Sequence, residues 1–309
     1  MHGDICRILS LDGGGAKGFY PLGILREVEA LLPRPIHETF DLIFGTSTGS
    51  IIAALLATGL SVDEIHALYK EHVPPIMQAS GKAAKTARLR ETGATVFGDA
   101  GFDTVLTGLG IVATKWQFET PMIFKSKETQ AYGRRATFIP GFGCKLADAI
   151  EASCSAYPFF EIKSLETTSG DVVDLIDGGY CADNTALYAL ADATVALGHA
   201  PENCRLLSLG CGHYPEPKRG FIARRINSFL PVQLLQKTLE VNTSSMDQLR
   251  RLLYSNVPTV RISDTYDKPE MATDMFEHDP KKLSLLRQRG VESFARREID
   301  VRRLLLDEG

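Results

Sequence analysis

The stretch that most constrains the fold is residues 40–59, FDLIFGTSTGSIIAALLATG. An apolar run ends at Gly45, Ser47 lies between Gly45 and Gly49, and an Ala/Leu/Ile-rich segment follows at once. This order predicts a strand, a sharp turn and a helix. It matches the nucleophile-elbow pattern G-x-S-x-G, in which small flanking residues relieve crowding around a serine held in a strained turn. Ser47 is therefore the candidate nucleophile, and the alternative is a turn that only caps a buried helix.

A second turn, DGGGAKG at residues 12–18, follows the apolar run 5–11 and precedes an amphipathic helical pattern. A glycine-rich turn at a helix N-terminus presents backbone N–H groups that bind anions. The P-loop spacing G-x-x-x-x-G-K-[ST] is absent, because Gly18 and Phe19 follow Lys17, whereas Gly13, Gly15 and Gly18 match the short G-x-G-x-x-G spacing. An oxyanion hole needs only N–H groups aimed at developing charge, and Gly13, Gly14 and Gly15 supply them without obstruction. A flexible or phosphate-binding turn is the alternative.

The bulk composition is that of an ordinary globular protein. The 309 residues carry a net charge of -4, which gives no support for DNA or RNA binding. The cysteines are scattered without a C-x-x-C pair or zinc spacing, so no metal is expected. The N-terminus lacks the features of a secretory signal, and the apolar run 51–60 is shorter than the roughly 20 residues that cross a bilayer. We therefore expect a cytoplasmic protein with reduced thiols.

Short apolar runs alternate with helical patterns along the chain. The apolar runs predict further strands at 110–115, 121–125, 159–162, 172–176, 205–209 and 259–262. Helical patterns lie at 143–154 and 187–197. This alternation predicts an α/β fold with a mainly parallel central sheet and helices on both faces, in one domain over residues 1–309.

Helix boundaries can be read from capping residues and prolines. Ser61 and Glu64 form a capping box that opens a helix through residue 69, which the prolines at 74 and 75 are expected to break. Residues 213–309 are expected to be mostly helical, with Pro231 separating two amphipathic pieces. Asp279 and Pro280 are expected to open a final helical pair.

Residues 78–110 are small and basic, with weak hydrophobic periodicity. We interpret them as a mobile lid or binding loop. The cations in this segment are Lys82, Lys85, Arg88 and Arg90. They are either a solvated helix face or contacts to phosphate, on a lipid headgroup or a nucleotide activator.

A serine nucleophile needs a base. The order Ser47, Asp177, His213 permits a catalytic triad, but His213 lies in a polar loop typical of a solvated histidine. Asp177 ends an apolar strand and precedes Gly178 and Gly179, so its carboxylate is expected at the edge of the sheet, where ligand sites form. An Asx-turn that closes the strand is the structural alternative.

Five segments together resemble the patatin-like phospholipases. They are DGGGAKG at 12–18, GTSTG at 45–49, DGG at 177–179, ASCSAYPFF at 152–160 and LLSLGCG at 206–212. The likeness covers the motif-bearing core, residues 1–212, and leaves 213–309 aside. One departure is that Asn184 is followed by Thr185, where the family often has Asn-Pro.

The resemblance implies a Ser-Asp dyad without histidine. Ser47 would be the nucleophile, Asp177 would take its proton, and the N–H groups of Gly13, Gly14 and Gly15 would receive the oxyanion. We read Asp12 as fixing the glycine turn. Lys17 stands where the family often has arginine and would keep a cation near the site. No metal or organic cofactor is implied.

The implied function is a serine acyl hydrolase that cleaves fatty acyl esters of membrane phospholipids through an acyl-enzyme, peripheral to the inner membrane when active. Stand-alone proteins of this kind resemble anti-phage effectors that a cyclic oligonucleotide switches on. Two alternatives are a phosphate-binding or scaffold protein that uses the glycine turn, and an esterase with a Ser-Asp-His triad. The oligomeric state is left open, a homo-oligomer included.

Overall fold

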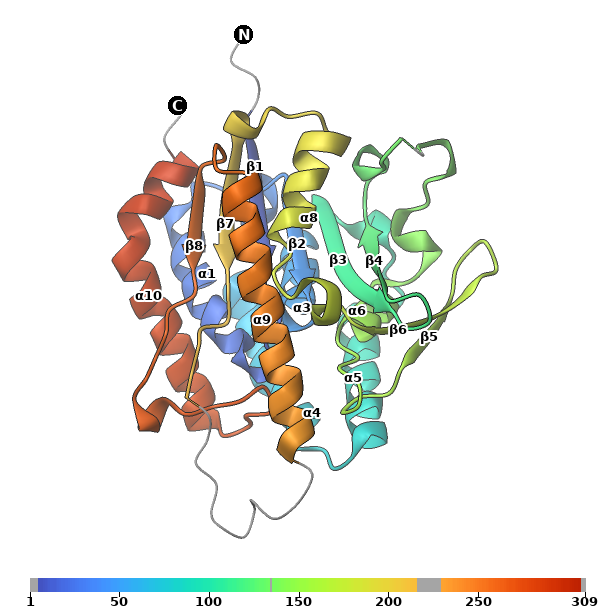
Figure 1. The fold of residues 1–309 in the computed structure, drawn as a ribbon, viewed down its shortest axis with the longest axis vertical. Helices are drawn as coiled ribbons and strands as arrows, with labels where there is room; N and C mark the ends of the chain where they lie inside the picture. The colour runs from blue at the N-terminus through green and yellow to red at the C-terminus, as the bar shows by residue number, and fades with distance from the viewer. Residues whose placement is uncertain (1–4, 134, 216–228, 307–309) are drawn as a thin grey trace.

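The computed structural model describes residues 5–133, 135–215 and 229–306, with the side chains of 229–233 excluded. Its centre is one eight-stranded sheet in the order β5-β6-β3-β2-β1-β7-β8, with β4 paired to β3 (Figure 1). The strands are β1 Cys6–Leu11, β2 Leu42–Thr46, β3 Gly108–Lys115, β4 Thr120–Lys125, β5 Lys163–Glu166, β6 Val172–Asp177, β7 Cys204–Leu209 and β8 Thr259–Ile262. Strands β3, β2, β1, β7 and β8 are parallel, whereas β4, β5 and β6 run antiparallel to their neighbours. The predicted mainly parallel sheet is confirmed.

The antiparallel strand β6 brings the two key motifs together. Strand β4 pairs with β3 along residues 110–115, so β2 and β6 must share the other edge of β3. The last residue of β2 pairs with Val112 and the last residue of β6 pairs with Ala113. The two strands therefore approach each other end to end. Asp177 was expected at the end of its strand, and this end-to-end meeting places it beside Ser47.

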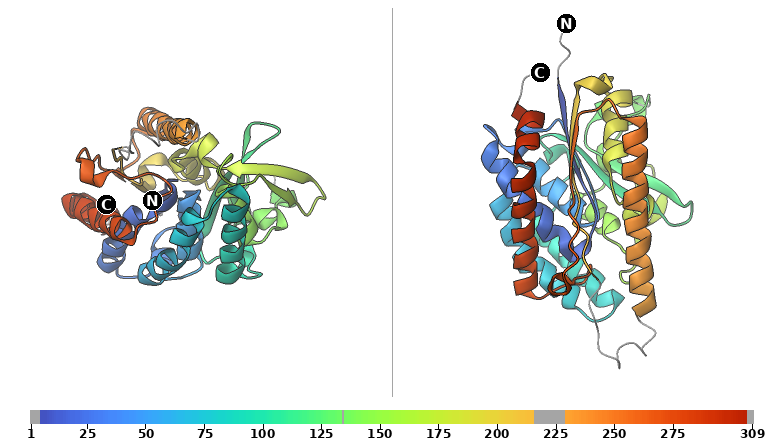
Figure 2. Two further views of the ribbon diagram at one scale, coloured as in Figure 1. Left: turned by 90° about the horizontal axis from the view of Figure 1, so that it is seen from below. Right: turned by 60° about the vertical axis from the view of Figure 1, so that its left-hand side comes forward.

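Helices cover both faces of the sheet, as predicted (Figure 2). One face carries α1 Phe19–Leu31, α3 Thr48–Ala57, α4 Val62–Gln78, α5 Lys82–Phe97, α6 Leu146–Ser153 and α10 Pro280–Leu306. The other carries α7 Gly179–Ala182, α8 Ala186–Ala191 and α9 Phe229–Leu253, while the short α2 Ile36–Thr39 leads into β2. Strand β8 and helix α10 extend the motif-bearing core, because β8 pairs with β7 and α10 packs on α1.

Helix α4 begins at the predicted capping box, in which Ser61 N–H donates to Glu64 Oε2 at 2.8 Å. The predicted break at its prolines is wrong, because the helix continues through both to Gln78. A proline keeps a helical φ and removes only one backbone donor. The buried side chains of Val73 and Ile76 hold the last turns against the core.

The segment interpreted as a loop is mostly the helix α5. Its hydrophobic pattern is weak because small residues form its contact face: a side chain at Gly93 would lie 3.5 Å from Ala147 Cβ on α6. Only Thr86, Leu89 and Gly93 are fully buried on this helix. Close helix packing through small residues therefore replaced the apolar stripe that the sequence lacks.

Three further predictions were wrong in detail. Residues 159–162 form no strand, because Glu161 N–H donates to Thr86 Oγ1 on α5 at 2.9 Å, and β5 begins only at residue 163. The expected final helical pair is one helix, α10, whose Gly290 packs against the backbone of α1. The pattern at 187–197 ends as α8 at residue 191 and a π-helical turn follows. The piece expected before Pro231 lies largely outside the described residues.

Candidate active site

Ser47 occupies the sharp turn between β2 and α3, as the sequence predicts. Its φ and ψ are 50° and -127°, a conformation that side-chain-bearing residues rarely adopt. The turn is crowded: a side chain at Gly45 would collide with the backbone of Gly49, and one at Gly49 with the backbone of Leu11. Glycine at both flanking positions is what permits this backbone. The strain fixes the Ser47 hydroxyl at the end of the sheet.

The Ser47 hydroxyl donates a hydrogen bond to Asp177 Oδ2 at 2.7 Å. The other carboxylate oxygen, Oδ1, accepts the N–H of Gly179 at 2.7 Å. Asp177 is only 1% exposed, and this burial raises its pKa to about 6, although the hydrogen bonds from Gly179 and Ser47 oppose the rise. No cation of the described residues forms an ion pair with it. The arrangement suits proton transfer from the serine to the carboxylate near neutral pH.

The predicted glycines after Asp177 have separate roles in this geometry. Gly178 lies where the chain leaves β6, and a side chain there would collide with the Val112 carbonyl and the Thr46 hydroxyl. Gly179 supplies the N–H that holds the carboxylate. Because a side chain at Gly178 would collide with the last residue of β2, the close approach of the two strands depends on this glycine.

Two serines in the segment 152–160 hold this pair from behind. Ser153 Oγ accepts the backbone N–H of Ser47 at 2.8 Å and donates to the Val112 carbonyl at 2.6 Å. The Ser155 carbonyl accepts the backbone N–H of Asp177 at 2.9 Å. Their roles were not predicted individually, although they lie in a segment that the sequence singled out. The signal available in the sequence was that both serines lie shortly before Pro158.

The three predicted oxyanion glycines are not equivalent. The N–H of Gly13 donates to the Asp183 carbonyl at 3.1 Å, so it is already engaged. Within the described part of the chain, the N–H groups of Gly14 and Gly15 have no hydrogen-bond partner. Gly15 lines the same pocket as Ser47. The geometry therefore leaves two of the three donors available for developing negative charge.

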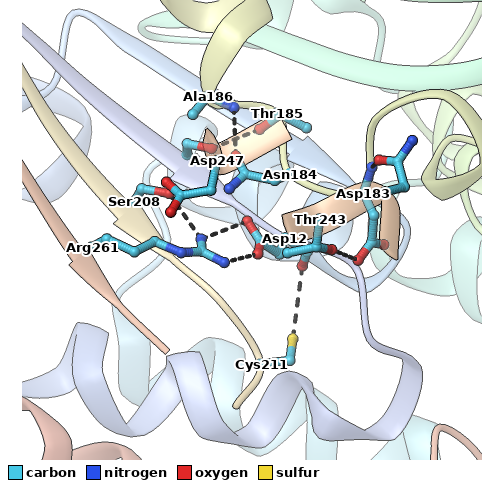
Figure 3. A network of polar contacts seen from close by, with 12 residues as sticks. Asp12, Asp183, Asn184, Thr185, Ala186, Ser208, Cys211, Thr243, Asp247 and Arg261 are labelled. Atoms are coloured by element: carbon cyan, nitrogen blue, oxygen red, sulfur yellow. Dashed lines mark hydrogen bonds and ion pairs between the residues drawn. The ribbon is translucent and has the colours of Figure 1, made fainter. Parts of the chain in front are cut away.

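Asp12 lies at the end of β1, directly before the glycine turn. Its carboxylate forms a two-pronged ion pair with Arg261 of β8, with Oδ1 2.9 Å from Nη1 (Figure 3). Arg261 Nη1 also donates to Ser208 Oγ of β7 at 2.9 Å. Burial raises the pKa of Asp12, and the guanidinium opposes that rise. Asp12 therefore links the glycine turn to the far edge of the sheet.

Lys17 is almost fully buried and forms an ion pair with Glu240, with Nζ 3.8 Å from Oε1. Asp183 is a buried carboxylate that the sequence reading missed. Its Oδ2 accepts the Thr243 hydroxyl at 2.6 Å, while its Oδ1 has no partner in the described residues. Burial raises the pKa of Asp183 to about 8, and the nearby Asp12 charge adds to the rise. The only sequence signal was its place at the end of the helical turn after Gly179.

Two narrow apolar pockets extend from the serine. The first is lined by Ser47, Gly15 and apolar side chains that include Phe160 and Phe276. The second runs between α4 and α5 and shares four residues with the first, which are Ile51, Val73, Ile76 and Leu89. Each encloses about 40 Å³ of open space. The two pockets are therefore neighbours, one at the Ser47 hydroxyl and the other between α4 and α5.

The four cations of the basic segment lie on α5 and contact the protein itself. Arg90 pairs with the buried Glu151 at 2.8 Å, and Arg88 pairs with Glu91 at 3.0 Å. Lys85 donates to the Ile76 and Met77 carbonyls at the end of α4. Lys82 lies 5.9 Å from the centre of the Tyr157 ring. Three of the four therefore already hold hydrogen-bond or ion-pair partners.

His213, the candidate third member of a triad, follows β7. Its backbone N–H donates to the Asp264 carbonyl at 2.9 Å, and burial lowers the pKa of its ring. Across the described ranges, no hydrogen bond connects its ring to Ser47 or Asp177. The geometry gives the triad no support.

The segment that carries this site matches a known protein family. The model of the family described as "Patatin-like phospholipase" matches residues 9–190, which include Ser47, Asp177 and the glycine turn. The chain belongs to the patatin-like phospholipase family. It is thus a hydrolase of the class that acts on lipid esters, as the motifs predicted.

Three relatives illustrate the family. The chain is 58% identical over 303 residues to the cUMP-AMP-activated phospholipase of Escherichia coli, which covers 98% of this chain and 95% of that protein. It is 30% identical to patatin-like protein 2 of Arabidopsis thaliana, over 62% of this chain and 54% of that protein. It is 29% identical to the cGAMP-activated phospholipase of Escherichia coli strain TW11681, over 60% of this chain and 55% of that protein.

The described residues contain neither a cluster of metal ligands nor a helix that could span a membrane. No group of three or more His, Cys, Asp or Glu side chains in that part of this patatin-like phospholipase is arranged to hold a metal ion. Among the helices of 5–133, 135–215 and 229–306, none combines the length and apolar character needed to cross a bilayer.

Proposed function

We propose that this patatin-like phospholipase cleaves fatty acyl esters of membrane phospholipids with a Ser47–Asp177 dyad and an acyl-enzyme intermediate. The observation that carries the proposal is the 2.7 Å hydrogen bond from Ser47 Oγ to a buried carboxylate, at the mouth of an apolar pocket. A serine hydroxyl becomes a nucleophile when a positioned base takes its proton. A carboxylate with a pKa of about 6 is ionised at neutral pH and still accepts a proton in the transition state.

The first half of the reaction transfers the acyl group to the enzyme. Ser47 Oγ attacks the ester carbonyl carbon while its proton moves to Asp177 Oδ2. The carbonyl oxygen gains the negative charge, and the N–H groups of Gly14 and Gly15 stabilise it together with the N-terminus of α3. Asp177 then gives the proton to the leaving alkoxide, and the lysophospholipid departs.

The second half releases the fatty acid. Water attacks the acyl carbon of the ester on Ser47, and Asp177 takes the proton from that water. The same two N–H groups stabilise the second oxyanion. When the intermediate collapses, the Ser47 oxygen leaves and recovers the proton from Asp177, so that the enzyme returns to its starting state.

The two neighbouring apolar pockets fit the acyl chain. Their open space of about 40 Å³ per pocket is far smaller than a fatty acyl chain needs, so α4 and α5 must separate when substrate enters. The small contact face of α5, with only three buried residues, favours such a movement. We therefore assign α5 the role of the lid that the sequence suggested for this segment.

Exposed aromatic side chains provide a surface for docking on a membrane. Trp116 and Phe118 lie in the β3–β4 hairpin and are 44% and 63% exposed. The Trp116 ring packs 5.3 Å from that of Tyr157, the residue next to the pocket residue Ala156. Aromatic side chains are favoured at the membrane interface. They would place the pocket mouth at the lipid surface, with the protein peripheral to the membrane.

A cyclic dinucleotide is proposed as the activator. The relative of 58% identity, which matches almost end to end, is named for activation by cUMP-AMP, and a second relative for activation by cGAMP. Such control suits an enzyme that would damage the membrane of its own cell. We therefore propose an effector that degrades the bacterial membrane in anti-phage defence.

The dyad is tested by fatty acid release from phospholipid vesicles in the presence of cUMP-AMP. Ser47→Ala should abolish release and Asp177→Asn should lower it about 1,000-fold, whereas His213→Ala should retain it within about twofold. A fluorophosphonate probe should label the wild type and His213→Ala but leave Ser47→Ala unlabelled. Full loss in His213→Ala together with an active Asp177→Asn would replace the dyad by the triad.

A further inference from the structure

A basic cavity lies apart from the active site, at the edge of the sheet formed by β8. It encloses about 650 Å³ and is bounded by the C-terminal parts of α9 and α10, the two helices that flank β8 in Figures 1 and 2. Six arginines line it, which are Arg205, Arg250, Arg251, Arg261, Arg297 and Arg303. They come from β7, β8, α9 and α10, so only the folded chain brings them together.

The arginines outnumber the acidic side chains of the lining, which are Asp264 and Asp300. Asp300 pairs with Arg297 at 3.2 Å, and Asp264 is held by Arg296 from outside the lining at 2.8 Å. Two carboxylates outside the lining also pair with its arginines: Asp12 pairs with Arg261, and Asp247 pairs with both Arg250 and Arg251.

Two of the lining arginines have no carboxylate partner in the part of the chain that the structure describes. Arg205 donates only to the Glu202 and Cys204 carbonyls, and no ion pair is formed by Arg303. Cations gathered in one cavity repel each other unless an anion joins them. The geometry therefore points to an anionic ligand.

We propose that this cavity binds the cyclic dinucleotide activator. The inference rests on the proposed activation by such a ligand and names its site. A cyclic dinucleotide carries two phosphodiester groups, and each guanidinium presents donors in a fork that matches phosphate oxygens. Guanidinium planes also stack on bases. The cavity volume lies within the range of small-molecule sites, roughly 300–1,000 Å³.

Arg261 connects this cavity with the catalytic half of the molecule. Its guanidinium lines the cavity and also holds Asp12, whose neighbour Gly13 begins the turn that supplies the oxyanion donors (Figure 3). A phosphate bound in the cavity would compete with Asp12 for this guanidinium. Arg261 is a positioning residue in this scheme, because it acts on the reaction only through Asp12.

The cavity is a better activator site than the basic face of α5. Both sites contain cations with partners inside the protein, but the four α5 cations lie along one helix, and none of them lines the pocket between α4 and α5. The arginine cavity has volume, surplus charge and a direct contact to the glycine turn through Arg261 and Asp12. The α5 residues remain the comparison site in the experiment.

The experiment measures cUMP-AMP binding by calorimetry and by the ligand-induced rise in melting temperature. Arg251→Glu and Arg303→Glu reverse charges on exposed side chains of the lining, singly and together. Arg302→Glu is the matched control, because Arg302 is the exposed neighbour of Arg303 on α10 but lies outside the lining. Arg88→Glu tests α5. The melting temperature of each variant without ligand is the reference for its own ligand-induced shift, because Arg251, Arg302 and Arg88 each lose an exposed ion pair.

We expect the double variant to raise the Kd for cUMP-AMP more than tenfold and to lose the ligand-induced rise in melting temperature. Arg302→Glu and Arg88→Glu should stay within twofold of the wild type. The cUMP-AMP concentration for half-maximal fatty acid release should shift in parallel with Kd.

Each other outcome overturns the site. Normal binding by the double variant excludes the cavity, and weakened binding by Arg88→Glu alone moves the site to α5, while both leave the proposed activation intact. If the double variant binds cUMP-AMP normally but no longer binds phosphatidylglycerol vesicles, the cavity is a site for a lipid headgroup and not for the activator. If the wild type hydrolyses phospholipid but binds neither cUMP-AMP nor cGAMP, the proposed activation fails, and this inference fails with it.

Discussion

The sequence Asp-Gly-Gly occurs at two places in this chain, each time directly after a strand. Residues 12–14 follow β1, and residues 177–179 begin at the last residue of β6. Both aspartates are almost fully buried, with 3% and 1% exposed. Asp12 faces the guanidinium of Arg261, whereas Asp177 faces the Ser47 hydroxyl and a backbone N–H. The same three residues therefore occupy two different electrostatic environments.

The groups around a buried carboxylate, and not the Asp-Gly-Gly sequence that carries it, therefore decide whether it acts as a base or as an ion-pair partner. Burial raises the pKa of Asp177 to about 6, and the two hydrogen bonds it accepts only partly oppose that rise, which suits a base. A fixed cation at Asp12 favours a permanent ion pair, which suits an anchor for the glycine turn. Variants of Asp12 and Asp177 should therefore differ in activity, in stability and in the pH dependence of both.

The largest contrast is in activity. Asp177→Asn should lower kcat/KM for phospholipid about 1,000-fold, because removal of a general base typically costs 10²- to 10⁴-fold. The protein should remain folded, as shown by its circular dichroism and melting curve. Asp12→Asn, measured at 15 °C where it is folded, should retain at least a tenth of the wild-type rate. Equal losses in both variants would end the distinction between base and anchor.

The second contrast is in stability. Asp12→Asn should lower the free energy of unfolding by about 3 kcal/mol, because it removes the carboxylate that forms the two-pronged ion pair with the buried Arg261 guanidinium. Urea denaturation at pH 7.5 measures it. A double-mutant cycle with Asp12→Ala and Arg261→Ala should show strong coupling between the two side chains. Additive effects would mean that the ion pair does not anchor the turn.

Asp177→Asn should have the opposite effect on stability. Because the folded-state pKa of Asp177 is raised from 3.8 to about 6, the folded protein loses stability as pH rises from about 4 to 6 and does not regain it above. That pKa difference corresponds to about 3 kcal/mol. The asparagine variant should therefore be more stable than the wild type by about 2 kcal/mol at pH 8, and by nearly nothing at pH 3.5. Urea denaturation at both values decides this, and a less stable variant at pH 8 would contradict it.

The smallest effect is the pH dependence of catalysis. The base must be ionised, so kcat/KM should rise with pH and reach half its plateau near pH 6, the pKa of Asp177. At pH 5 the rate should be about tenfold below the plateau. A soluble short-chain ester avoids effects of pH on the membrane. An inflection that stays in place in Asp177→Asn would assign the titration to another group.

Much of the fold was predictable from local signals. The elbow around Ser47, the strands that end at residues 11, 177 and 209, and the capping box at Ser61 all follow from apolar runs, glycines and capping residues. The helix α5 was not, because its contact face consists of small residues that give no hydrophobic period. The continuation of α4 through its prolines was missed because the buried side chains on either side of them, Val73 and Ile76, outweigh the local penalty.

The candidate site divides in the same way. Local sequence patterns indicated that Ser47 lies in a strained turn, that Asp12 follows a strand and that Asp177 ends one. They could do so because backbone sterics and strand patterning are local. Only the tertiary structure decided that β2 and β6 meet end to end on β3, which brings Ser47 and Asp177 within 2.7 Å. It alone placed Arg261 beside Asp12, 249 positions along the chain, and gave Asp177 no cationic partner among the described residues. Charge interactions depend on distance in space, which the order of residues does not contain.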